Sequence, residues 1–236
     1  AEILPGANCG GCGYPGCGGY ANSVVKGIAP VNACAPGGAE LAKKIGEIMG
    51  VTVEEGARKI AQVKCTGGGH DKTRYDYVGL SSCLGISRVS SGPLMCSYGC
   101  LGGGDCVAAC QFGAISMDPV TGLPVVDEEK CTACGACVKA CPKAIIELRN
   151  KGRRNMRVFV SCVNKDKGAV ARKACKAACI GCGKCAKACP FEAITVENNL
   201  AYIDYAKCRL CKKCVAECPT GAIHAVNFPV IKPKEE

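Results

Sequence analysis

The spacing of its cysteines constrains this chain more than any other feature. Cysteine fills 24 of the 236 positions, and most of these residues stand two or three residues apart, as in the run Cys131, Cys134, Cys137 and Cys141. Disulfide scaffolds are short secreted chains whose cysteines are spread through loops. Neighbours this close cannot all pair with distant partners. The spacing therefore predicts free thiolates that bind metal in a reducing compartment.

Two other classes of thiolate metal site, zinc sites and metallothionein-like sites, are the alternatives to iron. Zinc sites place two cysteine pairs a dozen or more residues apart and often recruit histidine, whereas this chain has only His70 and His224. A metallothionein-like mass of thiolates would lack a core, yet 48% of these residues are hydrophobic. The composition predicts a chain that folds around its metals.

The net charge of +10 would suggest a nucleic acid or an anionic membrane surface as partner. If the cysteines hold 4Fe-4S clusters, each core with its four thiolates has a charge of about −2. Six such clusters, the number that 24 cysteines would supply with ligands, would contribute roughly −12. The basic surplus then offsets the charge of the clusters. With no Trp and no helix-turn-helix or RNA-binding signature, a nucleic-acid partner is not expected.

The chain contains an internal repeat, in which residues 83–148 resemble residues 162–226. The cysteines keep the same register through both copies, and each copy closes on a compact run that ends in Cys-Pro. One position breaks the match, because Gly103 stands where the second copy has Cys182. The paired positions are Cys83 and Cys162, Cys96 and Cys175, Cys100 and Cys179, Cys106 and Cys185, and Cys110 and Cys189.

The fold class that these patterns predict is α+β. Each repeat should contain a small hairpin, one from residues 114–117 to 123–126 and one from 193–196 to 200–203. Single helical turns are expected at 138–141 and 186–189. Near the N-terminus, apolar residues at helical spacing predict helices at 38–49 and 53–61, the second with Thr52 and Glu55 as a capping box.

The domain organisation follows from the repeat. A small helical 4Fe-4S domain with two helices should occupy residues 1–62. Two tandem ferredoxin-like modules, each with two 4Fe-4S clusters, should follow at 63–150 and 151–236.

The second repeat holds a complete pair of bacterial ferredoxin runs. In such a run three cysteines bind one cluster and the fourth binds the other cluster. Closely spaced cysteines let one loop surround three corners of a cube and direct backbone N–H groups at its sulfurs. The predicted ligand sets are Cys179, Cys182, Cys185 and Cys218 for one cluster, and Cys189, Cys208, Cys211 and Cys214 for the other.

The first repeat follows the same rule with one ligand missing. Its first predicted set is complete and consists of Cys110, Cys131, Cys134 and Cys137. Its second set has only Cys100, Cys106 and Cys141, because Gly103 cannot bind iron. Cys65 has no counterpart in the other repeat, and it is predicted as the missing ligand.

The N-terminal segment has a different cluster pattern, formed by Cys9, Cys12, Cys17 and Cys34 among many glycines. Glycine permits positive φ and a close approach of the backbone to the cube. A phosphate-binding loop is the competing interpretation, but the segment lacks the Gly-Lys-Ser/Thr ending and a preceding strand.

Four cysteines remain, and they occupy equivalent positions in the two repeats: Cys83, Cys96, Cys162 and Cys175. If the repeats are related by pseudo-symmetry, these four could converge on a sixth cluster. The alternatives are buried free thiols, or a local site made by Cys65, Cys83, Cys96 and Cys100.

The segment from Cys9 to Cys17, the segment Asn32-Ala-Cys34-Ala-Pro-Gly-Gly38 and the ferredoxin repeats that follow together resemble the B subunit of the Rnf complex, along nearly the whole chain. The resemblance implies a role in an ion-translocating ferredoxin:NAD+ oxidoreductase, in which this subunit takes electrons from reduced ferredoxin and passes them to membrane subunits. It also implies a position at the cytoplasmic face of the cell membrane. Family members have an N-terminal membrane helix before the first motif, and this sequence, which has no run of 18 apolar residues and starts at Ala1, lacks it. The chain itself is then expected to be soluble.

The remaining motifs predict electron transfer without bond chemistry. The chain has no Ser-His-Asp set and no nicotinamide fingerprint. The basic run from Arg149 to Arg157, in particular Arg153, Arg154 and Arg157, could steer an acidic ferredoxin, although a solvated linker is the simpler interpretation. His70 is a candidate ligand that is more typical of a surface loop. A polyferredoxin subunit of a corrinoid-reducing or hydrogenase-linked complex, and an iron-sulfur sensor, are the alternative functions.

Overall fold

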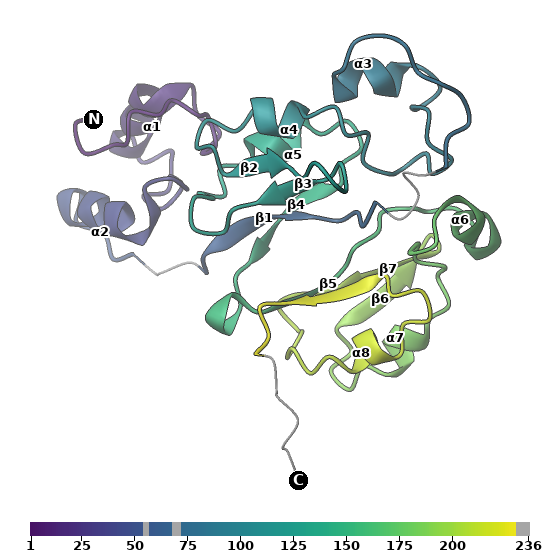
Figure 1. The fold of residues 1–236 in the computed structure, drawn as a ribbon. Helices are drawn as coiled ribbons and strands as arrows, with labels where there is room; N and C mark the ends of the chain where they lie inside the picture. The colour runs from purple at the N-terminus through teal and green to yellow at the C-terminus, as the bar shows by residue number, and fades with distance from the viewer. Residues whose placement is uncertain (54–56, 68–71, 230–236) are drawn as a thin grey trace. The chain divides into compact units, whose positions relative to one another are not determined.

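A computed structural model describes residues 1–53, 57–67 and 72–229 of the chain (Figure 1). They form two compact units, each described here by itself. Unit 1 comprises Ala1–Val63, Ser81–Leu84 and Gly102–Asn150, and unit 2 comprises Lys64–Leu80, Gly85–Leu101 and Lys151–Glu236. Short helices and short strands occur in both units, which confirms the mixed α and β content. Most of residues 64–101 belong to unit 2, whereas the sequence prediction put them in the first module.

Two helices form the N-terminal part of unit 1. The predicted helix at residues 38–49 is present as α2 (Gly38–Met49), and it ends at Gly50, which has φ = 67°. The second helix is α1 (Gly16–Val25), in the glycine-rich segment where the sequence predicted only a cluster motif. Tyr20 and Val24 of α1 pack against Leu41 and Ile45 of α2. This small core supports the loop that contains the first four cysteines.

The predicted helix at residues 53–61 is wrong in its described part. Lys59–Val63 is a strand, β1, which pairs antiparallel with β4 (Ile146–Asn150). Residues 54–56, with the capping residue Glu55, lie outside the described part of the chain. The backbone hydrogen bonds with β4 decide for the strand, in which Ile60 and Ala61 are buried, because tertiary pairing overrides weak local propensity.

The rest of unit 1 has the predicted hairpin, and a short helix overlaps the helical turn predicted at 138–141. Strands β2 (Ile115–Met117) and β3 (Pro124–Val126) pair antiparallel, with Ile115 opposite Val126. Helix α4 (Asp105–Ala108) precedes the hairpin and α5 (Ala136–Ala140) follows it. A helix α3 (Cys83–Arg88) begins in unit 1, and the division between the units falls within it.

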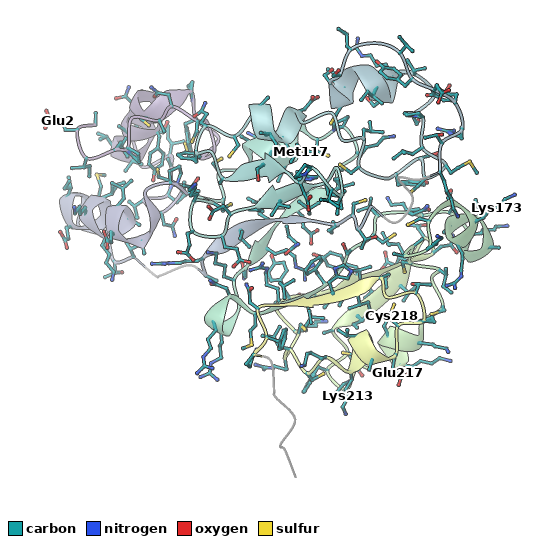
Figure 2. All side chains as sticks on the ribbon, in the orientation of Figure 1. Glu2, Met117, Lys173, Lys213, Glu217 and Cys218 are labelled. Carbon is teal, nitrogen blue, oxygen red and sulfur yellow. The ribbon has the colours of Figure 1, made fainter. Side chains whose placement is uncertain are left out.

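Unit 2 repeats this plan with its own elements. The hairpin of β6 (Ile194–Glu197) and β7 (Leu200–Ile203) has the predicted antiparallel pairing, and β5 (Arg157–Val160) pairs with β8 (Ile223–Val226). The helices of this unit are α6 (Gly168–Ala174), α7 (Lys184–Lys187) and α8 (Lys213–Ala216). A 3-10 turn, η1 (Arg153–Asn155), precedes β5. Figure 2 shows Glu217 and Cys218 directly after α8.

The strand registers reveal an equivalence that the sequence repeat missed. Val63 lies opposite Ile146 in unit 1, and Val160 lies opposite Ile223 in unit 2. Ile146 and Ile223 both stand five residues after the last cysteine of their runs. Val63 and Val160 are therefore equivalent, and each is followed two residues later by a cysteine. The structural counterpart of Cys162 is thus Cys65, whereas the sequence alignment had paired Cys162 with Cys83.

The basic run that joins the repeats is only partly exposed. Arg149 is 2% exposed in β4, and it donates to Glu147 Oε1 at 2.8 Å. Arg157 is 7% exposed in β5, and its guanidinium donates to the backbone oxygen of Asn155 at 3.0 Å. Arg153 and Arg154 between them are exposed. Only these two of the three predicted arginines can present their charge to a partner.

No helix in residues 1–53, 57–67 and 72–229 has the length and apolar character needed to cross a membrane.

Candidate metal centres

The cysteines of the N-terminal motif surround one hollow. It is small, and its lining includes Tyr20 and all four cysteines of the motif, Cys9, Cys12, Cys17 and Cys34. The Tyr20 hydroxyl donates to the backbone oxygen of Pro30 at 2.9 Å, which ties the two ends of the loop together. Burial raises the pKa of Cys34, and the nearby thiolates of the other three cysteines raise it further.

Backbone geometry shapes this first loop. Asn8 Oδ1 accepts a hydrogen bond from the Cys17 backbone N–H at 2.7 Å. Gly16, at the start of α1, has φ = +71°, and a Cβ there would lie 2.8 Å from Asn8 Oδ1. Glycine is therefore required at this position both by its backbone conformation and by the space available.

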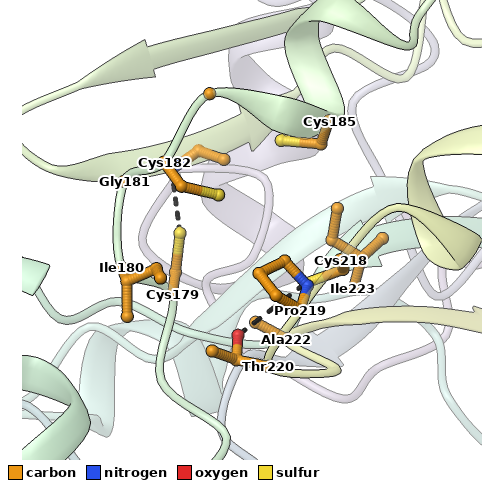
Figure 3. A pocket seen from close by; sticks show the side chains of 12 residues that line it. Cys179, Ile180, Gly181, Cys182, Cys185, Cys218, Pro219, Thr220, Ala222 and Ile223 are labelled. Atoms are coloured by element: carbon orange, nitrogen blue, oxygen red, sulfur yellow. Dashed lines mark hydrogen bonds between the residues drawn. The ribbon is translucent and has the colours of Figure 1, made fainter.

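The first ferredoxin set of unit 2 surrounds a second small hollow, lined by Cys179, Cys182, Cys185 and Cys218. Figure 3 shows the sulfur atoms of these four residues around one space. The Ala201 backbone N–H, from β7, lies 3.5 Å from Cys179 Sγ, and Cys218 Sγ lies 3.8 Å from the Thr220 hydroxyl.

The second ferredoxin set of unit 2 lines a third hollow. Its lining residues include the four cysteines of this set, Cys189, Cys208, Cys211 and Cys214. Burial raises the pKa of Cys214 to about 11, and the charges of Cys208 and Cys211 contribute. Cys211 is exposed, as is Cys182 in the neighbouring set.

The complete ferredoxin set of unit 1 is brought together as well. Burial raises the pKa of Cys137 to about 12, and the charges of Cys131, Cys134 and Cys110 contribute. The Ala114 backbone N–H lies 3.3 Å from Cys110 Sγ. In each of the four complete sets that the sequence predicted, the four cysteines therefore lie close together in the structure.

The incomplete set of unit 1 has Cys83 beside it. Burial raises the pKa of Cys106 to about 11, and the charges of Cys83 and then Cys141 contribute. A Cβ at Gly103 would lie 2.5 Å from the backbone nitrogen of Cys83. Asp105 accepts the Cys83 N–H at 2.9 Å and the Leu84 N–H at 3.0 Å. The backbone that positions Cys83 thus occupies the space that a side chain at position 103 would need.

Cys65, which the sequence assigned to that incomplete set, belongs to unit 2. The charges of Cys96 and Cys65 both raise the pKa of Cys175, after the larger effect of burial. Burial also raises the pKa of Cys162 to about 11, with contributions from Cys179 and Cys96. Cys83 is therefore a neighbour of Cys106 in unit 1, and Cys65 is a neighbour of Cys175 in unit 2.

Neither histidine contributes to a described site. His70 lies outside the described part of the chain. His224 lies in β8, with its ring centroid 6.0 Å from that of Phe159, and burial lowers its pKa.

The chemistry of these sites is that of crowded, partly buried thiols. Because burial raises the pKa of Cys106 and Cys214 to about 11 and that of Cys137 to about 12, iron must displace a proton from each of these thiols at neutral pH. In the described part of the chain no three Cys, His, Asp or Glu side chains converge tightly enough to hold a single metal ion. The cysteines instead border hollows, and a set of four thiolates around a hollow suits a 4Fe-4S cube.

Neighbouring sets adjoin one another within each unit. In unit 1 the thiolate of Cys106 affects the pKa of Cys137. A Cβ at Gly11, in the N-terminal loop, would lie 2.6 Å from the backbone oxygen of Cys134. In unit 2 the thiolate of Cys185 affects the pKa of Cys214. The three sets of unit 1 are thus contiguous, and so are the two ferredoxin sets of unit 2.

Replacing Gly11 by Ala should destabilise the contact between the N-terminal loop and the Cys131–Cys137 run. The new methyl group would overlap the backbone at Cys134, and overpacking of this kind costs about 1–3 kcal/mol. Chemical denaturation under anaerobic conditions measures the change. The matched control is Gly18→Ala, because a Cβ at Gly18 has no neighbouring atom within 4 Å. Equal stability of the two variants would contradict the contact.

Comparison with known families agrees with these sites. The family model described as "Putative Fe-S cluster" matches residues 4–36. A 4Fe-4S dicluster domain matches residues 96–145 and 178–222, and a second 4Fe-4S dicluster model matches residues 130–193. These matches support multiple 4Fe-4S clusters in the chain.

Curated relatives resemble nearly the whole chain. The B subunit of the Na+-translocating ferredoxin:NAD+ oxidoreductase complex of Acetobacterium woodii is 51% identical over 87% of this chain and 61% of its own length. The B subunit of the ion-translocating oxidoreductase complex of Methanosarcina acetivorans is 46% identical over 88% of this chain and 78% of its own length. The B subunit of the proton-translocating ferredoxin:NAD+ oxidoreductase complex of Clostridium ljungdahlii is 44% identical over 88% of this chain and 72% of its own length.

The chain therefore spans about three fifths of the Acetobacterium protein and more of the other two. Its cysteine sets and its 4Fe-4S dicluster domains make it an iron-sulfur electron-transfer protein. From the extent of these matches, the chain belongs to the family of B subunits of Rnf-type ion-translocating oxidoreductase complexes.

Proposed function

We propose that this chain accepts single electrons from reduced ferredoxin and relays them to membrane subunits of an Rnf-type complex. In this proposal the whole complex couples ferredoxin oxidation and NAD+ reduction to the translocation of Na+ or H+. The names of the relatives support the proposal. The observation that carries it is the contiguity of several four-cysteine sets within each unit. We further propose that the chain works at the cytoplasmic face of the cell membrane.

We propose five ligand sets for this relay. Four are those of the sequence prediction: Cys9, Cys12, Cys17 and Cys34; Cys110, Cys131, Cys134 and Cys137; Cys179, Cys182, Cys185 and Cys218; and Cys189, Cys208, Cys211 and Cys214. The fifth lies in unit 1 and includes Cys83, Cys106 and Cys141. Cys83 replaces Cys65 in this set because it adjoins Cys106.

A bound 4Fe-4S cluster would supply one-electron redox chemistry at each set. The residues of the chain hold the thiolates, exclude water and donate hydrogen bonds to sulfur. Backbone N–H groups of Ala114 and Ala201 lie 3.3 and 3.5 Å from the sulfurs of Cys110 and Cys179. Hydrogen bonds to cluster sulfurs favour the more negative, reduced state.

The set that contains Cys211 is the best candidate to receive the first electron. Cys211 is one of two exposed cysteines in the described residues, the other being Cys182. Its loop reads Lys207-Cys208-Arg209-Leu210-Cys211-Lys212-Lys213, and the four basic residues of this segment are exposed. Arg209 and Lys212 also line the hollow of this set. An acidic electron carrier would be attracted to such a surface.

The exposed arginines of η1 extend the same basic surface. A Cβ at Gly152 would lie 3.2 Å from Leu210 Cδ1, so the turn that presents Arg153 and Arg154 adjoins the Cys211 loop. The side-chain amide of Asn227, after β8, donates to the Asn155 backbone oxygen at 3.1 Å and holds this turn in place. Arg153, Arg154, Arg209 and Lys213 therefore form one candidate docking surface for ferredoxin.

Reversing three charges of this surface, in the variant R153E/R154E/R209E, should slow reduction of the chain by ferredoxin. Electrostatic steering raises association rates by about 10- to 1000-fold at low salt, so we expect a loss of roughly tenfold or more. Stopped-flow mixing with reduced ferredoxin measures the second-order rate. The difference from the unmodified protein should shrink as salt increases, because salt screens exposed charges.

The matched control reverses two exposed lysines elsewhere in unit 2, Lys165 and Lys167. This variant should change the rate much less, since neither lysine belongs to the Cys211 loop. Equal slowing of both variants would indicate a general effect of net charge and would remove the docking surface. An absence of any electron exchange between the unmodified chain and ferredoxin would overturn the proposed function itself.

A further inference from the structure

The two ferredoxin sets of unit 2 are bordered by different side chains at equivalent positions. Each set takes its fourth cysteine from a Cys-Pro pair, and the residue after that proline lines the hollow of the set. Thr220 follows Cys218 in this way and lines one hollow. Phe191 follows Cys189 and lines the other. A hydroxyl group therefore borders one set, and a phenyl ring borders its neighbour.

The hydroxyl at this position is found in only one of the four ferredoxin runs. The residues that stand two positions after the last cysteine of each run are Phe112, Lys143, Phe191 and Thr220. The ferredoxin pattern itself does not require a hydroxyl there, since the other three runs lack one. Thr220 thus makes the set of Cys218 chemically different from the other three.

Thr220 lies close to a sulfur of its own set. Its hydroxyl oxygen is 3.8 Å from Cys218 Sγ, and Figure 3 shows this contact at the hollow that the four cysteines surround. While Cys218 is a thiol, either group can donate. A thiolate bound to iron has no proton, so the hydroxyl must then donate and the sulfur must accept. Binding of iron therefore fixes the direction of this contact.

The turn that carries Thr220 is held on both sides. The backbone N–H of Gly221 donates to the backbone oxygen of Cys218 at 3.3 Å, and the backbone N–H of Ser161 donates to the backbone oxygen of Ala222 at 2.7 Å. Ala222 is 1% exposed. The threonine side chain is also stiff, because branching at Cβ restricts χ1. The hydroxyl is thus kept beside the sulfur at little further cost in entropy.

A second donor reaches the same set from another element. The backbone N–H of Ala201, in β7, lies 3.5 Å from Cys179 Sγ, and Ala201 lines the same hollow as Thr220. Two ligands of this set therefore have donors that come from outside the run of residues 179–185. At the position equivalent to Thr220, the side chain of Phe191 offers the neighbouring set only carbon atoms.

We propose that Thr220 is a positioning residue that donates a hydrogen bond to the Cys218 thiolate and raises the reduction potential of the cluster at that set. The proposal rests on the proposed function for the cluster itself. The step concerned is the uptake of one electron, in which no bond forms or breaks. A reduced cluster has one more negative charge than an oxidised one, so a donor to its thiolate stabilises the reduced state more.

This residue would bias the relay inside unit 2. The set of Cys211 is the proposed entry point, and the two sets share one buried core, which contains Cys185 of one set and Cys214 of the other. An electron that enters at Cys211 is therefore drawn toward the set of Cys218. Arg209 and Lys212 border the entry set, but they are exposed, and salt and water screen exposed charges.

Replacing Thr220 by valine tests the hydroxyl, because valine keeps the branched shape and removes the donor. T220V should keep its iron and lower the reduction equilibrium of one cluster by about fivefold, which is about 40 mV for a one-electron couple. T220S retains the hydroxyl and should keep the potential of the unmodified chain. Potentiometric reduction with dithionite, followed by electron paramagnetic resonance, measures both variants.

The reciprocal variant places a hydroxyl at the other set. F191T should raise the potential of a different cluster from the one that T220V lowers. The exchange F191T/T220F should therefore shift two clusters in opposite directions. The matched control is T195V, because Thr195 is an exposed threonine of β6 that lines neither hollow. This control should leave every potential unchanged.

Several results would overturn the role of Thr220. One is a T220V chain whose potentials equal those of the unmodified chain. Another is an equal shift in T220V and T220S, which would assign the effect to packing instead of the hydroxyl. If T220V loses iron, F191T decides the question, and a potential that does not rise in F191T overturns the proposal.

These measurements use dithionite and no ferredoxin. A shift in T220V without electron exchange between the chain and ferredoxin would keep the role of Thr220 and remove the proposed function. A normal ferredoxin reaction without any shift in T220V would do the reverse. The two proposals are thus tested separately.

Discussion

Removing iron from the reduced protein is expected to abolish the cooperative folding of both units. Within the described residues the strands pair only two at a time, and a two-stranded sheet is marginal in water by itself. The buried core of unit 2 includes Cys179, Cys185 and Cys214, and further cysteines pack against it. Small units of this kind have a net stability of about 5–15 kcal/mol. The free energy with which a structural metal site binds its metal is largely folding free energy. We therefore expect the stability lost with the iron to exceed the net stability of each unit, so that the iron-free units unfold.

Circular dichroism and hydrogen exchange of the iron-free chain measure this effect. A thiol reductant must be present throughout, so that disulfides do not replace the clusters as cross-links. Reconstitution with iron and sulfide should restore protection from exchange, and restoration should be less complete at pH 6 than at pH 8. The sign follows from the thiols: burial raises the pKa of Cys137 to about 12, so protons compete more strongly with iron as the pH falls. An iron-free chain with the unfolding midpoint of the loaded protein would contradict the prediction.

Replacing Gly181 by Ala is expected to cause the second-largest effect, a destabilisation of unit 2 by about 2–5 kcal/mol. Gly181 lies between Cys179 and Cys182 and has φ = +64°. A left-handed conformation costs an alanine about 1–2 kcal/mol. In addition, a Cβ there would lie 2.8 Å from both Cα and the backbone oxygen of Asn199, and such overpacking costs about 1–3 kcal/mol more.

A neighbouring glycine provides the matched control. Gly183 has φ = +73°, but a Cβ at this position meets no atom within 4 Å. Gly183→Ala should therefore show only the cost of backbone conformation. The difference between the variants isolates the contact between the cluster loop and the turn that joins β6 to β7. Denaturation midpoints and the fraction of iron retained measure it. Identical denaturation midpoints and iron contents for the two variants would mean that the turn at Asn199 can move away from the new methyl group without loss of stability. That result would contradict the prediction.

Local patterns predicted the parts of this chain that depend on nearby residues. The hairpins at 115–126 and 194–203 have the expected pairing, because their strands are separated by short turns rich in Asp, Asn and Gly. The helix at 38–49 follows from its apolar spacing. The four complete cysteine sets could be grouped from spacing, since a loop with cysteines three residues apart can present three thiolates to one centre.

Contacts between segments that are distant in the sequence were harder to predict. Residues 59–61 were predicted as helix and form β1, because their partner strand begins more than 80 residues later. The burial of Asn164, which is 1% exposed, was not predicted either. The exposure of Arg157 was also overestimated, because its place in the buried strand β5 depends on pairing with β8.

The sequence alone determined that this chain binds 4Fe-4S clusters through its cysteine runs, and it identified the family to which the chain belongs. Only the tertiary structure decided which cysteines are the neighbours of Cys65 and of Cys83. Aligned by sequence, Cys83 matched Cys162. The register of β1 against β4 makes Cys65 the counterpart instead, and Cys83 lies where a side chain at position 103 would otherwise begin. The physical reason is that spacing along the chain limits which thiolates can meet locally, whereas strand pairing and steric exclusion decide which distant thiolates do meet.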